Sequence, residues 1–175
     1  FYEKAIAFAK KYNVILLHDN AYSDIIFGGK EGKSFLSYPG AMEVGIEFYS
    51  LSKSYNMTGM RISFALGNKD VIQMFRKVRS QIDYGIFLPI QKAAVAALTG
   101  PQDNVKEQCR IYEERNYALC RGMSSIGWKI PDGQGTMFVW APIPENYTSS
   151  ERFTLDLMEK TGMIVTPGTA FGNLG

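Results

Sequence analysis

Residues 50–62 read Ser50-Leu51-Ser52-Lys53-Ser54-Tyr55-Asn56-Met57-Thr58-Gly59-Met60-Arg61-Ile62, and this stretch decides how the sequence is interpreted. Residues 44–51 predict one strand, which runs into this stretch, and residues 62–66 predict the next. The polar residues therefore lie where one strand ends and another begins. In open α/β sheets ligands bind at the carboxyl ends of the strands, so we expect a binding site here.

The side chains of residues 50–62 suit a phosphorylated carbonyl compound. Serine hydroxyls can donate hydrogen bonds to a phosphate dianion, and the guanidinium of Arg61 can bind two of its oxygens at once. A neutral Lys53 amine can attack a carbonyl carbon and form a Schiff base. The competing interpretation is a polar surface loop with an ordinary lysine, and composition alone does not separate the two.

A second polar group follows an apolar run nearer the start of the chain. Residues 14–17 predict a short buried strand that ends at His18-Asp19. A carboxylate at such an edge needs a partner, although the commoner role of Asp19 would be an Asx turn that ends the strand. Because side chains alternate along a strand, His18 points away from the Asp19 face, and we interpret it as a satisfied core histidine.

Strands and helices alternate over the first hundred residues, which predicts an α/β fold. Residues 20–44 are rich in Gly, Ser, Asp and Pro and predict an irregular connection. After residue 125 we expect a smaller α+β unit, with a β-hairpin at 128–142 and a strand at 163–166. Helices are expected at residues 1–12, about 68–82, 89–98, 103–125 and 150–160.

The composition is that of an ordinary globular protein, with 46% hydrophobic and 21% charged residues. A net charge of +2 gives no argument for nucleic acid or an anionic membrane as a partner. No apolar run approaches the roughly 20 residues of a membrane-spanning helix. We therefore expect neither kind of partner, and no motif indicates a metal site.

The two cysteines and the two ends of the chain lead to further expectations. Cys109 and Cys120 fall in one predicted helix, about 16 Å apart, which is beyond the roughly 7 Å limit for a disulfide. Reduced cysteines are usual in the cytosol, so we predict a cytoplasmic protein.

Because Phe1 falls in the first turn of a helix and Gly175 directly follows a turn-rich stretch, we expect a piece of a longer polypeptide.

Residues 50–62 resemble the pyridoxal-phosphate (PLP) attachment signature of class I/II aminotransferases. Lysine at 53, glycine at 59, arginine at 61 and the small and apolar residues around them fit that pattern, with Ser63 in place of its final Gly or Ala. The stretch 19–22 is similar to the Asp-x-x-Tyr motif of the family. Residues 135–138 (Gly-Thr-Met-Phe) and 167–172 (Pro-Gly-x-x-Phe-Gly) also resemble segments of its small domain.

The resemblance implies roles for individual residues. Lys53 would hold PLP as a Schiff base and move the substrate's α-proton, and Asp19 would pair with the ring nitrogen. Tyr22 would hydrogen-bond the phenolic oxygen of the ring. Phe138 is expected in the core and not at the substrate. The phosphate would be held by Ser50, Ser52 and Arg61.

The resemblance also implies the fold-type-I architecture. Residues 1–105 would form the C-terminal part of the PLP-binding large domain, which has a mostly parallel sheet covered by helices. Residues 106–175 would form a truncated small C-terminal domain. The family is homodimeric when full length, and its arginine for the substrate carboxylate lies beyond the end of this chain.

Three functions remain open on the sequence. The first is an aminotransferase that moves an amino group between an amino acid and a 2-oxo acid. The second is a PLP-dependent carbon–sulfur lyase, and the third is a PLP-binding effector domain of a transcription regulator. A pyridoxamine spectrum after addition of an amino acid would favour the first, and release of pyruvate and ammonia the second. A winged-helix region before Phe1 would favour the third.

Overall fold

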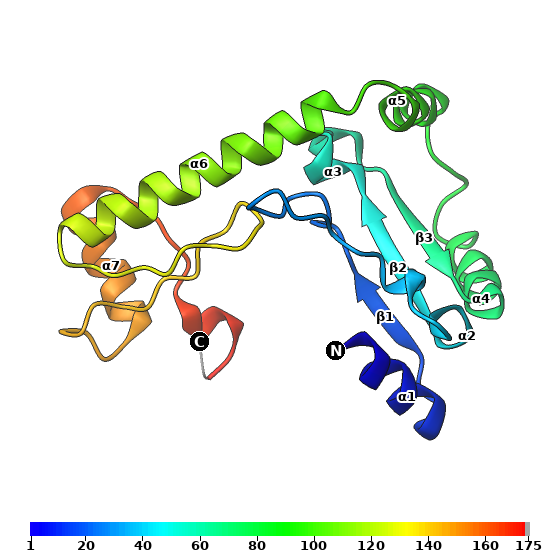
Figure 1. Cartoon of the computed structure of the whole chain (residues 1–175), viewed down its shortest axis with the longest axis horizontal. Coiled ribbons are helices and arrows are strands. Elements are labelled where there is room, and N and C mark those ends of the chain that lie inside the picture. Colours follow the sequence, from blue (N-terminus) through cyan, green and yellow to red (C-terminus); the bar gives the residue numbers. More distant parts are fainter. Residues whose placement is uncertain (174–175) are drawn as a thin grey trace. The chain divides into compact units, whose positions relative to one another are not determined.

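The computed structural model describes residues 1–173 (Figure 1). Three short 3-10 helices cover Phe35–Ser37, Thr58–Met60 and Gly168–Phe171. The other elements follow in the order α1 (Tyr2–Tyr12), β1 (Leu16–Asp19), α2 (Ala41–Val44), β2 (Gly45–Ser50), α3 (Leu51–Ser54), β3 (Ser63–Gly67), α4 (Lys69–Arg79), α5 (Leu88–Thr99), α6 (Asp103–Ser125) and α7 (Ser150–Thr161). The predicted long helices are all present, with ends that differ by up to three residues.

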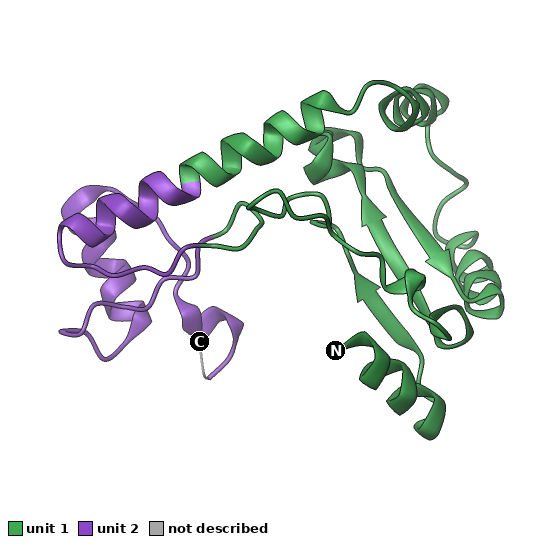
Figure 2. Ribbon diagram, viewed as in Figure 1, with its two compact units in different colours: residues 1–115, 133–138 green, residues 116–132, 139–175 purple. Residues whose placement is uncertain are grey.

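The chain divides into two compact units (Figure 2). One contains residues 1–115 and 133–138, and the other contains residues 116–132 and the described residues from 139 onward. The division falls within α6, between Arg115 and Asn116. The domain boundary expected at 105–106 concerns the complete fold and stays a prediction.

A three-stranded sheet in the order β1-β2-β3 forms the centre of the first unit. β1 pairs with β2 in parallel and β2 pairs with β3 antiparallel, so the sheet is mixed. Helices pack on this sheet, and the predicted α/β class is confirmed. β1 begins two residues later than expected, and Leu17 is 67% exposed, so this strand is covered on one face only among the described residues.

A small apolar cluster covers the α1 side of the sheet. Ile6 from α1, Phe35 and Ala41 are its buried members. Gly45 allows this close packing, because a Cβ there would lie 2.7 Å from Cε1 of Phe35 and 2.8 Å from the Leu16 carbonyl oxygen. The cluster therefore holds α1 and the 35–37 turn against the beginning of β2.

A second cluster lies beneath the segment that carries Lys53. Leu51, Ile62 and Ala94 are buried together, and Leu51 is fully inaccessible. Leu51 and Ile62 belong to the two ends of the signature stretch, and Ala94 belongs to α5. The apolar positions of the signature thus anchor its polar positions to a packed core.

Two strand predictions are wrong. Residues 128–142 form no hairpin, and their one ladder contact in the described chain is an isolated bridge between Ile26 and Gly135. Residues 163–166 are also not in a strand. A strand requires a continuous ladder of backbone hydrogen bonds to a neighbour. Residues 134–136 form two such bonds, to Phe27 and Ile25, which is too short a pairing for a strand, and residues 163–166 pair with no strand among residues 1–173.

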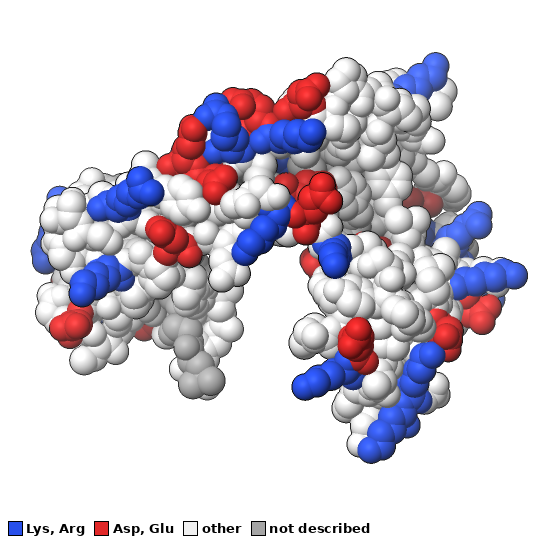
Figure 3. Space-filling model, viewed as in Figure 1, with Lys and Arg blue, Asp and Glu red and all other residues white. Residues whose placement is uncertain are grey.

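The surface charges of α6 form ion pairs along the helix. Arg110 pairs with Glu107 and Glu114, all on the exposed face, as the helical spacing predicts. On the face seen in Figure 3, acidic and basic side chains are interspersed and do not gather by sign. Cys109 and Cys120 are both thiols on α6, one half-buried and one buried.

Candidate active site at the carboxyl edge of the sheet

The ends of β1 and β2 bring the predicted site residues to one edge of the sheet (Figure 1). Asp19 ends β1 opposite Phe48, and the Asn20 N–H donates to the Phe48 carbonyl at 2.9 Å. Ser50 ends β2 opposite Ser63, which begins β3. Because β1 and β2 run in parallel, Asp19 and the Lys53 segment after Ser50 share this edge.

The short helix α3 presents Lys53 at this edge. Ser50 caps α3, because its hydroxyl oxygen accepts the Ser52 N–H at 3.2 Å. The Thr58 hydroxyl donates to the Ser52 carbonyl at 2.9 Å and closes the following loop back onto the helix. Ser52 is buried and Lys53 is half-buried, so the lysine is only partly exposed to solvent.

Lys53 and Tyr22 lie together. The Lys53 Nζ is 5.7 Å from the centre of the Tyr22 ring, within the range of a cation–π contact. Among residues 1–173, Lys53 forms no salt bridge. Tyr22 follows Asp19 by three residues, so one tight turn connects the carboxylate to the ring beside the lysine.

The segment 133–138 adds an aromatic side chain to this group. The Phe27 N–H donates to the Gln134 carbonyl at 2.9 Å, and the Thr136 N–H donates to the Ile25 carbonyl at 2.8 Å. These bonds bring Phe138 to the Tyr22 ring, with 5.7 Å between ring centres in an edge-on arrangement. Phe138 is 61% exposed, so the expected core position is wrong for the described chain. Phe138 belongs to the Gly-Thr-Met-Phe stretch, and that motif was the sequence signal that could have placed it at the candidate site.

Asp19 uses little of its hydrogen-bonding capacity. Its Oδ1 accepts the Ala21 N–H at 3.4 Å, which is the expected Asx turn in a long and weak form. Its Oδ2 has no hydrogen-bond partner among residues 1–173. The Asx turn therefore forms, but it leaves most of the hydrogen-bonding capacity of the Asp19 carboxylate unused. The exposed Oδ2 remains available to a ligand.

Arg61 is close to the other site residues in sequence, but among residues 1–173 it forms no hydrogen bond with Ser50 or Ser52. It stands just before β3, and its Nη1 donates to the Thr58 carbonyl at 3.2 Å, its one hydrogen bond in the described chain. Its φ of 51° is in the left-handed region, which costs a residue with a Cβ about 1–2 kcal/mol. Asn56 in the same loop has a φ of 53°. The loop therefore holds strained backbone next to the lysine.

Tyr49 and Asp24 were not predicted and stabilise the turn that carries Tyr22. The Tyr49 hydroxyl donates to Oδ2 of Asp24 at 2.5 Å. Burial, and then the Asp24 carboxylate, raise the pKa of Tyr49 well above its ordinary value, so the phenol stays a donor. The bond attaches the turn to β2 directly before Ser50. The sequence gives no clear signal for it, because the two residues are 25 positions apart.

Two hollows lie in this unit, and neither is lined by Lys53 or Asp19. One of about 650 Å³ lies against α6 and includes Asp24 and Tyr55. The other, of about 560 Å³, includes Arg61 and Ser63. Of the predicted site residues, Arg61 lines the second hollow, whereas Asp19, Tyr22, Ser50, Ser52 and Lys53 line neither of the two.

The donor set at this edge fits a phosphorylated pyridine aldehyde. It offers an amine without an ion-pair partner, a carboxylate with an open oxygen, a phenol, two serines and a guanidinium. The amine suits an aldehyde carbon, the carboxylate suits a protonated ring nitrogen, and the hydroxyl and guanidinium groups suit a phosphate. Three histidine, cysteine, aspartate or glutamate side chains grouped to hold a metal ion do not occur among residues 1–173.

Comparison with known proteins gives a consistent result. A sequence model of the family described as aminotransferase class I and II matches residues 1–173. The LL-diaminopimelate aminotransferase of Moorella thermoacetica is 46% identical over 175 residues, which are all of this chain and 45% of that protein. The enzyme of the same name from Syntrophobacter fumaroxidans is 47% identical, with the same coverage.

Solved structures of similar proteins have the same fold. Apo-BacF from Bacillus subtilis superimposes with a TM-score of 0.92 and 41% identity, over 99% of this chain and 44% of that one. A probable N-succinyldiaminopimelate aminotransferase from Thermus thermophilus gives a TM-score of 0.91 and 34% identity, over 98% of this chain and 46% of that one. The chain thus spans somewhat under half the length of these relatives.

Proposed function

Because this chain belongs to the aminotransferase class I and II family over residues 1–173, we propose that the full-length protein is an aminotransferase. It moves an amino group between an amino acid and a 2-oxo acid with PLP, the cofactor on which this family depends. The observation that carries the proposal is the position of the Lys53 amine beside Tyr22, at the edge where β1 ends in Asp19.

The residues of the edge divide the chemistry among them. When bound, PLP supplies an electron sink for the electron pair left on the substrate's α-carbon. Lys53 would hold the cofactor and move the α-proton, since the residue is half-buried and its amine forms no ion pair in the described chain. The Asp19 carboxylate would offset the positive charge of a protonated ring nitrogen, and the Tyr22 phenol would donate to the ring oxygen.

Ser50, Ser52 and Arg61 are the proposed phosphate ligands. The Ser50 oxygen accepts a backbone N–H, which leaves its own hydrogen available to a phosphate. Arg61 is exposed and bound by a single hydrogen bond to the Thr58 carbonyl. Exchange of that bond for a phosphate oxygen costs little, because solvent-exposed hydrogen bonds contribute little net free energy.

We propose LL-diaminopimelate as the amino acid substrate. The support is the name shared by the relatives that are 46% and 47% identical to this chain. The described residues carry no information on the far end of a substrate, so this part of the proposal rests on similarity.

The predicted homodimer and cytoplasmic location also stand as proposals. Ile82, Tyr84 and Phe87 between α4 and α5, and Leu88 at the start of α5, are strongly exposed, which supports a covering partner in the full-length protein. Two thiols support a reducing compartment. In residues 1–173, none of the helices has the length and apolar character needed to cross a membrane.

Reduction of the PLP-loaded full-length protein with borohydride tests the cofactor assignment. After proteolysis, mass spectrometry should find the reduced adduct on Lys53. The Lys53→Ala variant should lose the adduct and reduce turnover by about 10⁴-fold or more. Lys69→Ala, at the start of the exposed helix α4, is the matched control and should keep both. An adduct on another lysine would overturn the assignment.

Product analysis then separates the three functions. Wild-type protein given LL-diaminopimelate and a panel of 2-oxo acids should convert one oxo acid to its amino acid. Release of pyruvate and ammonia from a sulfur amino acid would replace the proposal by the lyase. Cofactor binding at Lys53 without any turnover, together with a winged-helix region before Phe1, would replace it by the regulator domain.

A further inference from the structure

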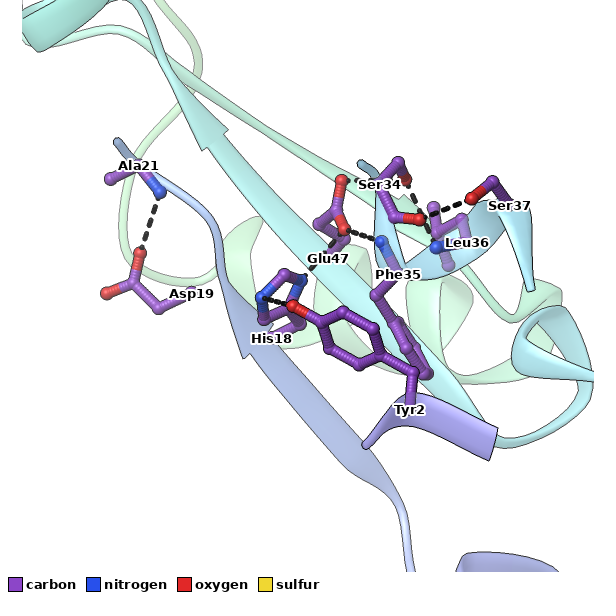
Figure 4. Close-up of polar contacts among 9 residues, drawn as sticks. All are labelled: Tyr2, His18, Asp19, Ala21, Ser34, Phe35, Leu36, Ser37 and Glu47. Carbon is purple, nitrogen blue, oxygen red and sulfur yellow. Dashed lines mark hydrogen bonds and ion pairs between the residues drawn. The ribbon is translucent and has the colours of Figure 1, made fainter. Parts of the chain in front are cut away.

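A buried carboxylate lies behind the candidate site, on the opposite face of the same two strands (Figure 4). Glu47 of β2 is 6% exposed and accepts three hydrogen bonds. They come from His18 Nδ1 at 2.8 Å, the Phe35 N–H at 2.6 Å and the Ser34 hydroxyl at 2.9 Å. Burial alone would raise the pKa of Glu47, but these hydrogen bonds outweigh it and the net pKa is lowered. Glu47 is therefore a fixed anion at neutral pH.

The hydrogen bonds continue from Glu47 to the first helix. The Nε2 of His18 lies 3.1 Å from the Tyr2 hydroxyl, and the two rings meet edge-on with 5.3 Å between their centres. Tyr2 also packs against the Phe35 ring at 5.8 Å. The chain Tyr2–His18–Glu47 thus joins α1, β1, β2 and the 34–37 turn.

The hydrogen-bonded series Tyr2–His18–Glu47 holds the backbone on both sides of Asp19. His18 lies directly opposite Glu47 in the parallel pairing, and Asp19 lies opposite Phe48. The Asn20 N–H is bound to the Phe48 carbonyl, and the Asn20 side chain adds to the lowering of the Glu47 pKa. Figure 4 shows His18 and Asp19 on opposite sides of the strand. The rotation of β1 that satisfies His18 is the rotation that points Asp19 toward the candidate site.

We propose that Glu47 and His18 are positioning residues, which fix the end of β1 so that the Asp19 carboxylate meets the cofactor's ring nitrogen. The inference rests on the proposed function, because it needs a cofactor at Lys53. Asp19 has one weak hydrogen bond of its own, so its direction depends on the strand that carries it. A misplacement of about 1 Å at a reacting group can cost about 100-fold in rate.

The test uses full-length protein loaded with PLP and follows the absorption of the bound cofactor against pH. A carboxylate at the ring nitrogen changes the proton affinity of the chromophore, so Asp19→Asn gives the reference shift. Glu47→Ala should shift the titration midpoint in the same direction, by about one pH unit, a tenfold change in proton affinity. Glu47→Gln should titrate like wild type, because its amide oxygen can still accept from His18 and Phe35 while its NH₂ donates to Ser34.

Glu43→Ala is the matched control. It removes another carboxylate, which forms an ion pair with Lys10 of α1 at 2.7 Å and, among residues 1–173, forms no hydrogen bond or ion pair with β1. Its midpoint should not move. If Glu47→Ala does not fold, His18→Leu carries the test, since leucine fills a similar volume and removes both hydrogen bonds.

Two failures can be told apart. A wild-type midpoint in well-folded, PLP-loaded Glu47→Ala or His18→Leu would overturn the positioning role and leave the aminotransferase proposal intact. Absence of a reducible adduct on wild-type Lys53 would overturn the proposed function and this inference with it.

Discussion

The two faces of the β1–β2 pair differ in how far their polar groups are satisfied. On the α1 face, His18 and Glu47 are hydrogen-bonded to each other and to three further groups. On the other face, Asp19 has one bond of 3.4 Å, and Lys53 beyond the strand end has no salt bridge in the described chain. The α1 face, whose polar groups are saturated with hydrogen bonds, holds the two strands together. The polar groups of the other face have unused hydrogen-bonding capacity and can bind a ligand.

The difference between the two faces shows what a buried charged residue can do at a distance from the candidate site. A buried carboxylate contributes little to stability relative to a packed apolar residue, but it demands a unique arrangement of donors around it. Here that arrangement includes the residue next to Asp19. The unique arrangement of donors on one face of the strands thus fixes the position of Asp19 on the other face.

The largest expected effect is on stability, through Glu47→Ala. Removal of this carboxylate leaves the half-buried His18 ring, the half-buried Ser34 hydroxyl and the buried Phe35 N–H without their acceptor. We expect the free energy of unfolding of the full-length protein to fall by about 3–5 kcal/mol, as for other broken buried pairs. Urea unfolding followed by circular dichroism measures it.

Glu43→Ala serves as the exposed counterpart. Its ion pair with Lys10 is solvent-accessible on both sides, and such pairs contribute about 0–1 kcal/mol. Equal losses for the two variants would show that burial does not distinguish the two carboxylates, and would break the comparison of faces.

The next effect is catalytic, through Asp19→Asn. The substitution keeps the shape and the Ala21 contact but removes the charge opposite the ring nitrogen. We expect kcat of the full-length enzyme to fall by about 100-fold, as when one electrostatic stabiliser is lost. PLP should remain bound, because Lys53 and the phosphate ligands are untouched. Asp70→Asn, in the exposed first turn of α4, should turn over normally. Normal turnover by Asp19→Asn would contradict the assigned role.

Much of the first unit could be predicted from the sequence, because its signals are local. The apolar run before Ser50 predicted β2, and strand alternation correctly turned His18 away from Asp19. The long helices followed from their periodicity and ends. In the structure Asn68 caps α4, and its side chain accepts two backbone N–H groups. The site residues came from the spacing of the signature, and their roles stay predictions.

Features that depend on distant pairings could not be predicted in this way. Residues 128–142 and 163–166 have apolar runs typical of strands, but a strand forms only beside a neighbour. Glu47 is a charged residue inside a predicted strand, and nothing local shows that Ser34 and Phe35 supply donors for it. The Tyr49–Asp24 bond has the same character.

Acid should lower the free energy of unfolding through Glu47 on the α1 face, and by a smaller amount than the Glu47→Ala substitution. The pKa of Glu47 is lowered in the folded state, so its contribution to stability is complete above the ordinary glutamate value of 4.5. It is lost as the pH falls from there through the lowered pKa. We therefore expect unfolding free energy to decrease with acid over this window, and Glu47→Gln to show a flatter profile. An identical slope in the two proteins would mean that Glu47 is not the group being titrated.

The smallest expected effect concerns strain, and it separates the two regions by backbone instead of side chains. Arg61 at the open edge and Asn13 at the end of α1 both have left-handed φ values, of 51° and 54°. Asparagine tolerates this region well and arginine does not, because only the short amide can bond locally to its own backbone. Without PLP, Arg61→Gly should raise the free energy of unfolding by about 0.5 kcal/mol, the relief of strain less the entropy of a new glycine. Asn13→Gly should leave it unchanged within error. If denaturant midpoints show the same gain for both, then strain is not concentrated at the edge that carries Lys53, and the contrast between the regions rests on hydrogen bonding alone.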